Sequence, residues 1–308
     1  MPDVDQGPLP VTDGAGPGPH RDLPVPSLVE GHARDWLRAG PDSRVVAPAR
    51  PSATVMLLRE SPAATGVEVF VLRRVGTMAF APGMVAFPGG GVEPRDADPG
   101  VPWAGPSPRR WAELLGVEEP LARELVTAAA REVFEECGVL LAGRSAAEVV
   151  ADVAGPSWQA ERRALLDRTQ SFGELLSRRG LVLRTDLMAL RAHWVTPACE
   201  PRRYDTRFFA ARMPRGQHAD GDSSEAEHAA WVRPAEVLRA HEQGRELLLP
   251  PTQVMLEHLR EVTDLDAWLD RPATVRPVQP WPVERDGRLW MRCPVDADGH
   301  GLPAGTAP

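Results

Sequence analysis

The chain has 308 residues, of which 43% are hydrophobic, and a formal net charge of −8. This length is enough for one large or two small domains with a buried core. The acidic balance gives no broad positive surface, so we expect no nucleic-acid partner. The longest apolar stretch, residues 78–92, is short and interrupted by proline and glycine, so we expect no membrane-spanning segment.

The cysteine content indicates a reducing compartment. The three cysteines, Cys137, Cys199 and Cys293, are too few and too scattered for a disulfide framework or a zinc site. Their odd number fits the cytosol, and residues 1–5 have neither the basic region nor the apolar run of a signal peptide. We therefore expect a cytoplasmic protein.

Composition divides the chain into a central domain and two extensions. Residues 1–43 are predicted to be a mostly disordered tail, because residues 1–26 are rich in proline, glycine and aspartate, with one short helix near 32–38. The folded domain is expected over residues 44–270. Residues 271–308 are again rich in proline and are expected to form an extended C-terminal segment.

The central domain alternates between strand and helix patterns, which predicts an α/β fold. The expected strands are 53–58, 67–72, 84–87, 187–194 and 206–212. The expected helices are 119–137, 145–153, 157–168, 171–179 and 252–270, with a strand-to-helix step at 231–236. A short helix is also expected at 111–117, and the helices between 145 and 180 are expected to form an exposed excursion.

The most informative stretch is residues 128–139, where three carboxylates lie within five residues of a helical run. Helical spacing puts Glu132, Glu135 and Glu136 on the same side, where like charges repel. Arg131 can meet Glu135 across one turn, but one guanidinium does not balance three carboxylates. Crowded oxygen ligands of this kind suit Mg²⁺ or Mn²⁺, although a solvated acidic helix face would have the same pattern.

A glycine-rich loop upstream favours the metal site. Residues 87–96 read FPGGGVEPRD, and residues 131–139 read REVFEECGV. Together they resemble the Nudix box, G-x5-E-x7-R-E-U-x-E-E-x-G-U, where U is apolar. Gly90 matches the first glycine, and Asp96 stands where the family has its first Glu. Arg131 lies 35 residues after Asp96 instead of eight, so the box contains an insertion of 27 residues, at about 97–124.

The resemblance implies an α/β/α sandwich on a mixed β-sheet, in which the box forms a strand, a loop and a helix. It implies a divalent metal, Mg²⁺ or Mn²⁺, held by Glu132, Glu135 and Glu136 and by the carbonyl of Gly90. Arg131 would orient one of these carboxylates, and Asp96 would support the loop. The implied activity is hydrolysis of a diphosphate linkage in a nucleoside diphosphate derivative, where metal neutralises the charge of the polyanionic substrate.

The sequence patterns at other candidate functional residues are less specific. Glu225, shortly before Trp231, is our candidate for the general base, with Glu227 as the alternative; a solvated acidic loop would look the same. His228 is expected to be a surface residue, because metal activation removes the need for a histidine base. Arg73 and Arg74 could bind substrate phosphates, or they could be a solvent-facing and an ion-paired strand residue.

The interrupted box resembles that of the mammalian peroxisomal coenzyme A diphosphatase and its bacterial relatives. Coenzyme A or acyl-coenzyme A is therefore the expected substrate, although residues 82–85 lack the histidine of the coenzyme A pattern. ADP-ribose, NADH or a dinucleoside polyphosphate are alternative substrates, and a non-catalytic nucleotide-binding module is an alternative function. The expected partner is a small molecule, and the protein could also form a homodimer.

Overall fold

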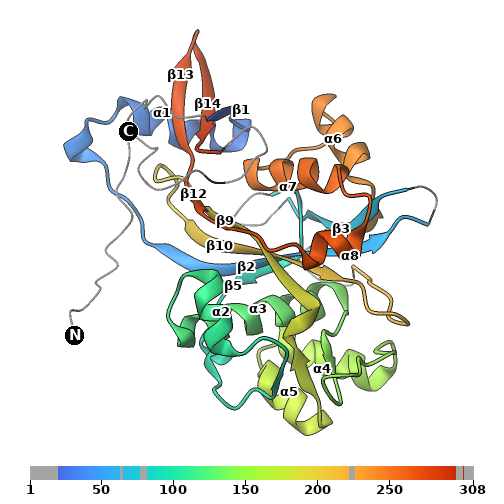
Figure 1. The fold of residues 1–308 in the computed structure, drawn as a ribbon. Helices are drawn as coiled ribbons and strands as arrows, with labels where there is room; N and C mark the ends of the chain where they lie inside the picture. Colours follow the sequence, from blue (N-terminus) through green and yellow to red (C-terminus); the bar gives the residue numbers. More distant parts are fainter. Residues whose placement is uncertain (1–19, 63–64, 77–81, 222–225, 296–300, 302–308) are drawn as a thin grey trace. The chain divides into compact units, whose positions relative to one another are not determined.

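The computed structural model describes residues 20–62, 65–76, 82–221, 226–295 and 301. The chain divides into two compact units (Figure 1). The larger unit contains Pro51–Ala192 and Thr206–Val275, and the smaller one contains Met1–Arg50, His193–Asp205 and Arg276–Pro308. Strands β2 (Ala49–Glu60), β9 (Met188–Val195) and β10 (Arg203–Arg212) each have residues in both units.

The larger unit is built on a sheet with the strand order β11-β3-β2-β10-β9, to which β4 and β5 add short pairings with β3 and β2. The strands are β2 (Ala49–Glu60), β3 (Val67–Arg74), β4 (Val85–Ala86), β5 (Gly89–Gly91), β9 (Met188–Val195), β10 (Arg203–Arg212) and β11 (Ala226–Val232). The predicted pair at 53–58 and 67–72 is antiparallel, with Leu58 opposite Val69. β-Branched and apolar residues dominate both strands because both faces of the sheet are covered.

Helix α3 (Glu119–Cys137) packs on one face of this sheet and is almost entirely buried from Ala122 onward. Pro120 lies in its first turn, and Gly138, with φ of 65°, ends it by donating to the Phe134 carbonyl. The prediction of a helix at 119–137 that stops at Gly138 is confirmed. Its apolar residues join Phe70 and Leu72 of β3 and Phe209 of β10 in the hydrophobic core.

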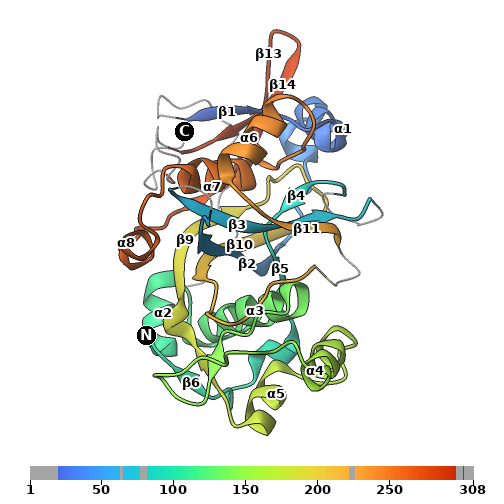
Figure 2. The same cartoon turned by 90° about the vertical axis from the view of Figure 1, so that its right-hand side faces the viewer.

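The opposite face of the sheet is covered by α6 (Pro234–Glu242) and α7 (Pro250–Arg260). Figures 1 and 2 show α3 on one side of β2, β3 and β10, and α6 and α7 on the other. The predicted α/β/α sandwich with a mixed sheet is therefore confirmed.

A second layer of elements lies outside α3. It consists of helices α2 (Pro108–Leu115), α4 (Pro156–Leu166) and α5 (Phe172–Arg179) and a small sheet of β6 (Trp103–Ala104), β8 (Val182–Arg184) and β7 (Ala142–Gly143). β6 is parallel and β7 antiparallel to β8. The short helix predicted within the insertion is α2, whose Trp111 meets Phe209 edge to face at 5.7 Å.

Two helix predictions were wrong in detail. Residues 145–153 form no helix, because Val150 donates to the Ala142 carbonyl and its own carbonyl accepts from the Gln217 side chain. These tertiary bonds hold Val150 beside β7, after a turn at residues 146–147. The helix predicted at 252–270 is two helices, α7 and α8 (Leu265–Asp270), because the Asp264 side chain accepts from Ala267 N–H and starts a new helix.

The smaller unit has its own antiparallel sheet, in the order β1-β14-β13, against which α1 packs. Its elements are β1 (Arg21–Pro24), α1 (Ser27–Arg38), β12 (Pro277–Val278), β13 (Trp281–Arg285) and β14 (Arg288–Cys293). Arg292 of β14 binds both carboxylate oxygens of Asp22 in β1, at 2.7 and 2.8 Å, so this ion pair joins two strands that are 270 residues apart in the sequence. α1 contains the short helix predicted near 32–38.

In the part of the chain that the structure describes, no helix combines the length and apolar character needed to cross a membrane.

Candidate metal and diphosphate site

The glycine loop lies against α3, the helix that contains Glu132, Glu135 and Glu136, because glycines let the loop backbone come close to the helix side chains. β5 pairs with β2 so that Gly90 is opposite Ala53. A Cβ on Gly89 would lie 2.5 Å from the Ala53 carbonyl oxygen, and a Cβ on Gly90 would lie 2.4 Å from Glu132 Oε1. The second contact places the Gly90 backbone directly beside a carboxylate of α3, in a space that any other residue would fill.

Arg131 is the centre of the hydrogen-bond network. Its side chain is 1% exposed, and its Nε and Nη2 bind both oxygens of the fully buried Asp96, at 2.8 and 3.0 Å. Its Nη1 donates to Glu132 Oε1 at 2.7 Å and to Glu135 Oε2 at 2.8 Å. Nη2 also donates to the Gly91 carbonyl at 3.1 Å. One guanidinium therefore joins both halves of the motif across the 27-residue insertion.

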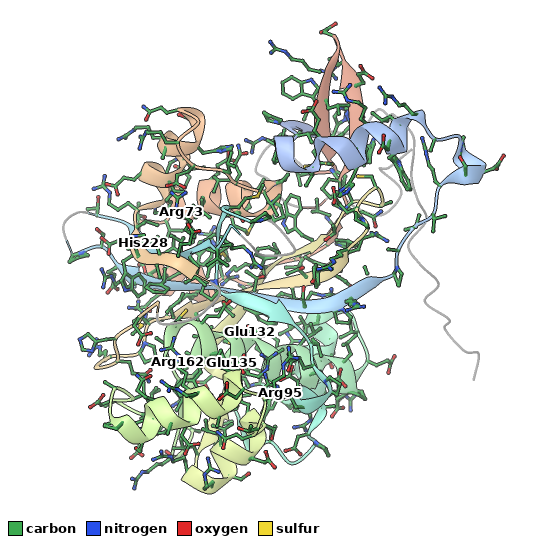
Figure 3. The ribbon with its side chains drawn as sticks, turned by 180° about the vertical axis from the view of Figure 1, so that it is seen from behind. Arg73, Arg95, Glu132, Glu135, Arg162 and His228 are labelled. Atoms are coloured by element: carbon green, nitrogen blue, oxygen red, sulfur yellow. The ribbon has the colours of Figure 1, made fainter. Side chains whose placement is uncertain are left out.

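Glu136 is fixed from the loop side. Its Oε2 accepts from the backbone N–H of Gly89 at 2.7 Å. Glu132, Glu135 and Glu136 thus all face the glycine loop and its Arg131 partner, as the helical spacing predicts, and all three are nearly buried. Figure 3 shows Glu132 and Glu135 together on the α3 side of the sheet.

Burial shifts the pKa values of this cluster. It raises the pKa of Glu132 to about 7, although the nearby charge of Arg131 lowers it. Burial also raises the pKa of Glu135, although Arg131 and Arg95 both lower it. Burial lowers the pKa of Arg131, but Glu132, Asp96 and Glu135 more than reverse this effect. Two buried carboxyls with raised pKa values, side by side, indicate a place where a further cation would be stabilised.

The donors fit a hard divalent cation, but the described residues do not form a closed cage of three His, Cys, Asp or Glu side chains. Mg²⁺ needs no such cage, since it keeps several waters and is commonly held by one or two carboxylates together with substrate phosphates. The Gly90 backbone, Glu132 and Glu136 have the right chemistry and lie together. Glu135 has both oxygens bound to guanidinium groups, Oε2 to Arg131 and Oε1 to Arg95.

Two arginines of this network were missed from the sequence. Arg95 binds Glu135 at 2.9 Å, and Arg162 of α4, itself buried, donates to the Glu135 carbonyl at 2.9 Å and to Asp220 at 2.5 Å. Their partners are 27 to 58 residues away in the sequence, so no helical or strand spacing could reveal them. In Figure 3 both lie close to Glu135.

The two candidate substrate arginines face opposite sides of the sheet. Arg73 forms an ion pair with Glu246, between α6 and α7, and Figure 3 shows it with His228 on the far side from Glu132. Because neighbouring strand residues alternate, Arg74 shares the face of Leu72, which packs in the core with α3. Arg74 Nε is buried and has no hydrogen-bond partner among the described residues.

The candidate base Glu225 lies outside the described residues. The alternative, Glu227, is exposed and accepts from the backbone N–H of Gly76 at 3.2 Å. It lies at a bulge where β11 pairs with β3, between Ala226 opposite Arg74 and His228 opposite Arg73. The prediction of His228 as a surface residue agrees with its exposure.

The chain is similar to known proteins over most of its length. A sequence model of the NUDT19 Nudix domain matches residues 115–260. The chain is 27% identical to the putative nudix hydrolase 7 of Caenorhabditis elegans over 219 residues, which are 71% of this chain and 64% of that protein. It is 28% identical to the acyl-coenzyme A diphosphatase NUDT19 of Gallus gallus in an alignment 249 positions long, which covers 66% of this chain and 65% of that protein. The chain therefore spans slightly less than two thirds of these relatives. Among solved structures it resembles a Nudix hydrolase from Alicyclobacillus acidocaldarius, with 26% identity, a TM-score of 0.60, and coverage of 74% of this chain and 99% of that one.

Proposed function

We propose that this chain, a member of the Nudix hydrolase superfamily, hydrolyses the diphosphate linkage of a nucleoside diphosphate derivative with Mg²⁺ or Mn²⁺ as cofactor. The observation that carries the proposal is that Arg131 joins the Gly91 carbonyl and Asp96 to Glu132 and Glu135, while the N–H of Gly89 binds Glu136. A surface-exposed acidic helix, the alternative interpretation, would not bury these carboxylates.

Glu132, Glu136 and the Gly90 carbonyl are the groups that we assign to the metal. A bound divalent cation would supply charge neutralisation for the diphosphate and acidify a coordinated water. Arg131 holds Glu132 in place and keeps it from turning away from the loop. Glu135, predicted from the sequence as a ligand, is better supported as a partner of two arginines, because each of its oxygens is bound to a guanidinium.

Substrate phosphates need donors on the same face as the metal carboxylates. Arg74 meets this condition, whereas Arg73 is neutralised by Glu246 on the other face. The buried Nε–H of Arg74 has no partner among the described residues, so a charge-assisted hydrogen bond to a polyanion would satisfy it. We therefore assign phosphate binding to Arg74. Glu225 stays our candidate for the base.

Coenzyme A or acyl-coenzyme A is the substrate that we favour. The support is the interrupted motif and the similarity to a protein named acyl-coenzyme A diphosphatase. ADP-ribose, NADH and dinucleoside polyphosphates are the alternatives, and a non-catalytic nucleotide-binding module is the alternative outside enzymes. A cytoplasmic location and a homodimer remain predictions of the sequence.

The test is a substrate screen with purified protein and either metal, in which cleavage products are separated by chromatography. We expect coenzyme A or its acyl esters to be cleaved with the highest kcat/KM. A preference for ADP-ribose would refute the substrate assignment and leave the reaction class standing. Nucleotide binding without cleavage of any compound would favour the binding module.

Glu135→Gln and Glu136→Gln give the matched test of the site. We expect both to lower kcat by orders of magnitude while the fold is kept, because Gln preserves shape and removes charge. Unchanged turnover in both variants would contradict the assignment of this site.

A further inference from the structure

Arg95 lies in a short 3-10 helix, η2 (Pro94–Ala97), that follows the three glycines and also contains Asp96. The Nudix box specifies no residue type at its position. Its side chain is 15% exposed and makes four contacts. Nε donates to Glu93 at 2.5 Å, and Nη2 donates to Glu135 at 2.9 Å. Nη1 donates to the carbonyls of Leu165 and Gln170, at 2.6 and 3.3 Å. A planar guanidinium can serve these acceptors together, which a lysine ammonium on its flexible stem does less well.

Two of these contacts reach the turn between α4 and α5. That turn contains Arg168, which has φ of 57°, a conformation that non-glycine residues adopt at a cost of about 1–3 kcal/mol. Arg168 also pairs with the second oxygen of Glu93 at 2.8 Å. Arg95 and Glu93 therefore hold a strained turn of the helical excursion against the motif, although this turn follows it by about 70 residues.

The charges give Arg95 a role beyond packing. Four carboxylates, Glu93, Asp96, Glu132 and Glu135, meet around Arg131, which can compensate only part of their charge. Arg95, which is only 15% exposed, adds a second guanidinium to the carboxylates, and it contacts Glu135 but neither Glu132 nor Glu136. With Arg131 on the other oxygen, it holds the Glu135 carboxylate from both sides.

We infer that Arg95 is a positioning residue of the catalytic site. It fixes Glu135 and joins the interrupted motif to the α4–α5 turn, so that the excursion helps to build the site. This inference rests on the proposed diphosphate hydrolysis. It predicts that Arg95 controls turnover while leaving the metal affinity of Glu132 and Glu136 intact.

The experiment compares Arg95→Ala and Arg95→Lys with Arg110→Ala. Arg110 is an exposed arginine of α2 that pairs with Glu113, three residues along, and it serves as the matched control. Steady-state kinetics are measured with coenzyme A, or with the best substrate of the screen, in Mn²⁺. Mn²⁺ affinity is measured separately from the electron paramagnetic resonance signal of the free ion.

For Arg95→Ala we expect a fall in kcat of about 10- to 100-fold, since a displacement near 1 Å has effects of this size. KM and the Mn²⁺ dissociation constant should stay within about threefold of wild type. Millimolar guanidinium should restore part of the activity of Arg95→Ala, and Arg95→Lys should fall between this variant and wild type. Arg110→Ala should match wild type.

Two results would overturn the inference. Turnover of Arg95→Ala within twofold of wild type would show that Glu135 needs no second cation. Equal losses of turnover and Mn²⁺ affinity, without guanidinium rescue, would show that Arg95 only maintains the fold. If wild type cleaves no diphosphate, the proposed function fails, and hydrogen exchange then tests the structural role of Arg95 by itself. The backbone amides of residues 165–171 should exchange faster in Arg95→Ala than in Arg110→Ala. Equal exchange rates in the two variants would reject the role of Arg95.

Discussion

The three glycines of the loop provide a test of the site by adding one methyl group at a time. In Gly90→Ala, the new Cβ would lie 2.4 Å from Glu132 Oε1 and 2.8 Å from Glu132 Cδ. Ordinary contacts begin at 3.4 Å, so the carboxylate must move by about 1 Å. The move opposes the 2.7 Å hydrogen bond from Arg131 and takes place in a buried position.

A displacement of this size at a catalytic group can lower the rate about 100-fold, which corresponds to about 2.7 kcal/mol of transition-state stabilisation. We therefore expect Gly90→Ala to fold and to lose about 100-fold in kcat. Gly91→Ala is the control, because its Cβ would have its nearest atom, the Pro51 carbonyl oxygen, at 4.0 Å. Gly89→Ala should instead lose stability, because its Cβ would meet backbone atoms of Ala53 and Thr54 at 2.5 and 2.7 Å.

The assay is the initial rate of product release with metal, together with thermal unfolding followed by circular dichroism. A Gly90→Ala rate within threefold of wild type would refute the placement of Glu132 at the Gly90 backbone. An equal loss in Gly91→Ala would refute the geometric reasoning, since that position has room for a methyl group.

Three further predictions concern other parts of the site. Asp96→Asn removes one of the three carboxylates that bind the buried Arg131 guanidinium and should lower the free energy of unfolding by about 1–3 kcal/mol; an unchanged free energy of unfolding in urea titrations would refute this. In the metal-free protein, the pKa of Glu132 is raised from 4.5 to about 7, so its contribution to stability should fall as pH rises between these values. Metal affinity should rise over the same range and level off above pH 7, and a flat affinity from pH 5 to 8 would contradict the shift. Arg74→Ala should raise KM about 10-fold or more, whereas Arg73→Ala should change it less than threefold; the reverse order would refute the assignment of faces.

The sequence predicted those features that depend on local pattern. The run from Glu119 to Cys137 has helical composition, a proline in its first turn and a glycine after its end, and the structure has the helix at these residues. The contact of Arg131 with Glu135 also follows from spacing, since the two residues are one helical turn apart. The strand pair β2–β3 follows from two apolar runs separated by turn residues.

The features that depend on distant contacts could not be predicted. Arg95 has an ordinary loop sequence around it, and its partners Glu135 and Leu165 become visible only when the chain is folded. Residues 145–153 have helical composition, but the hydrogen bonds of Val150 to Ala142 and Gln217 hold the segment in a non-helical conformation. Tertiary hydrogen bonds outweigh local helix propensity here, which amounts to less than about 1 kcal/mol per residue.

The central claim is that this chain cleaves a diphosphate by means of the metal carboxylates beside the glycine loop. The most direct measurement is product analysis of coenzyme A incubated with wild type and with Glu136→Gln, each with Mg²⁺ and with excess chelator. We predict 3′,5′-ADP and 4′-phosphopantetheine from wild type with Mg²⁺, and none above background in the other three reactions. Equal product from Glu136→Gln, or from wild type in chelator, would contradict the account.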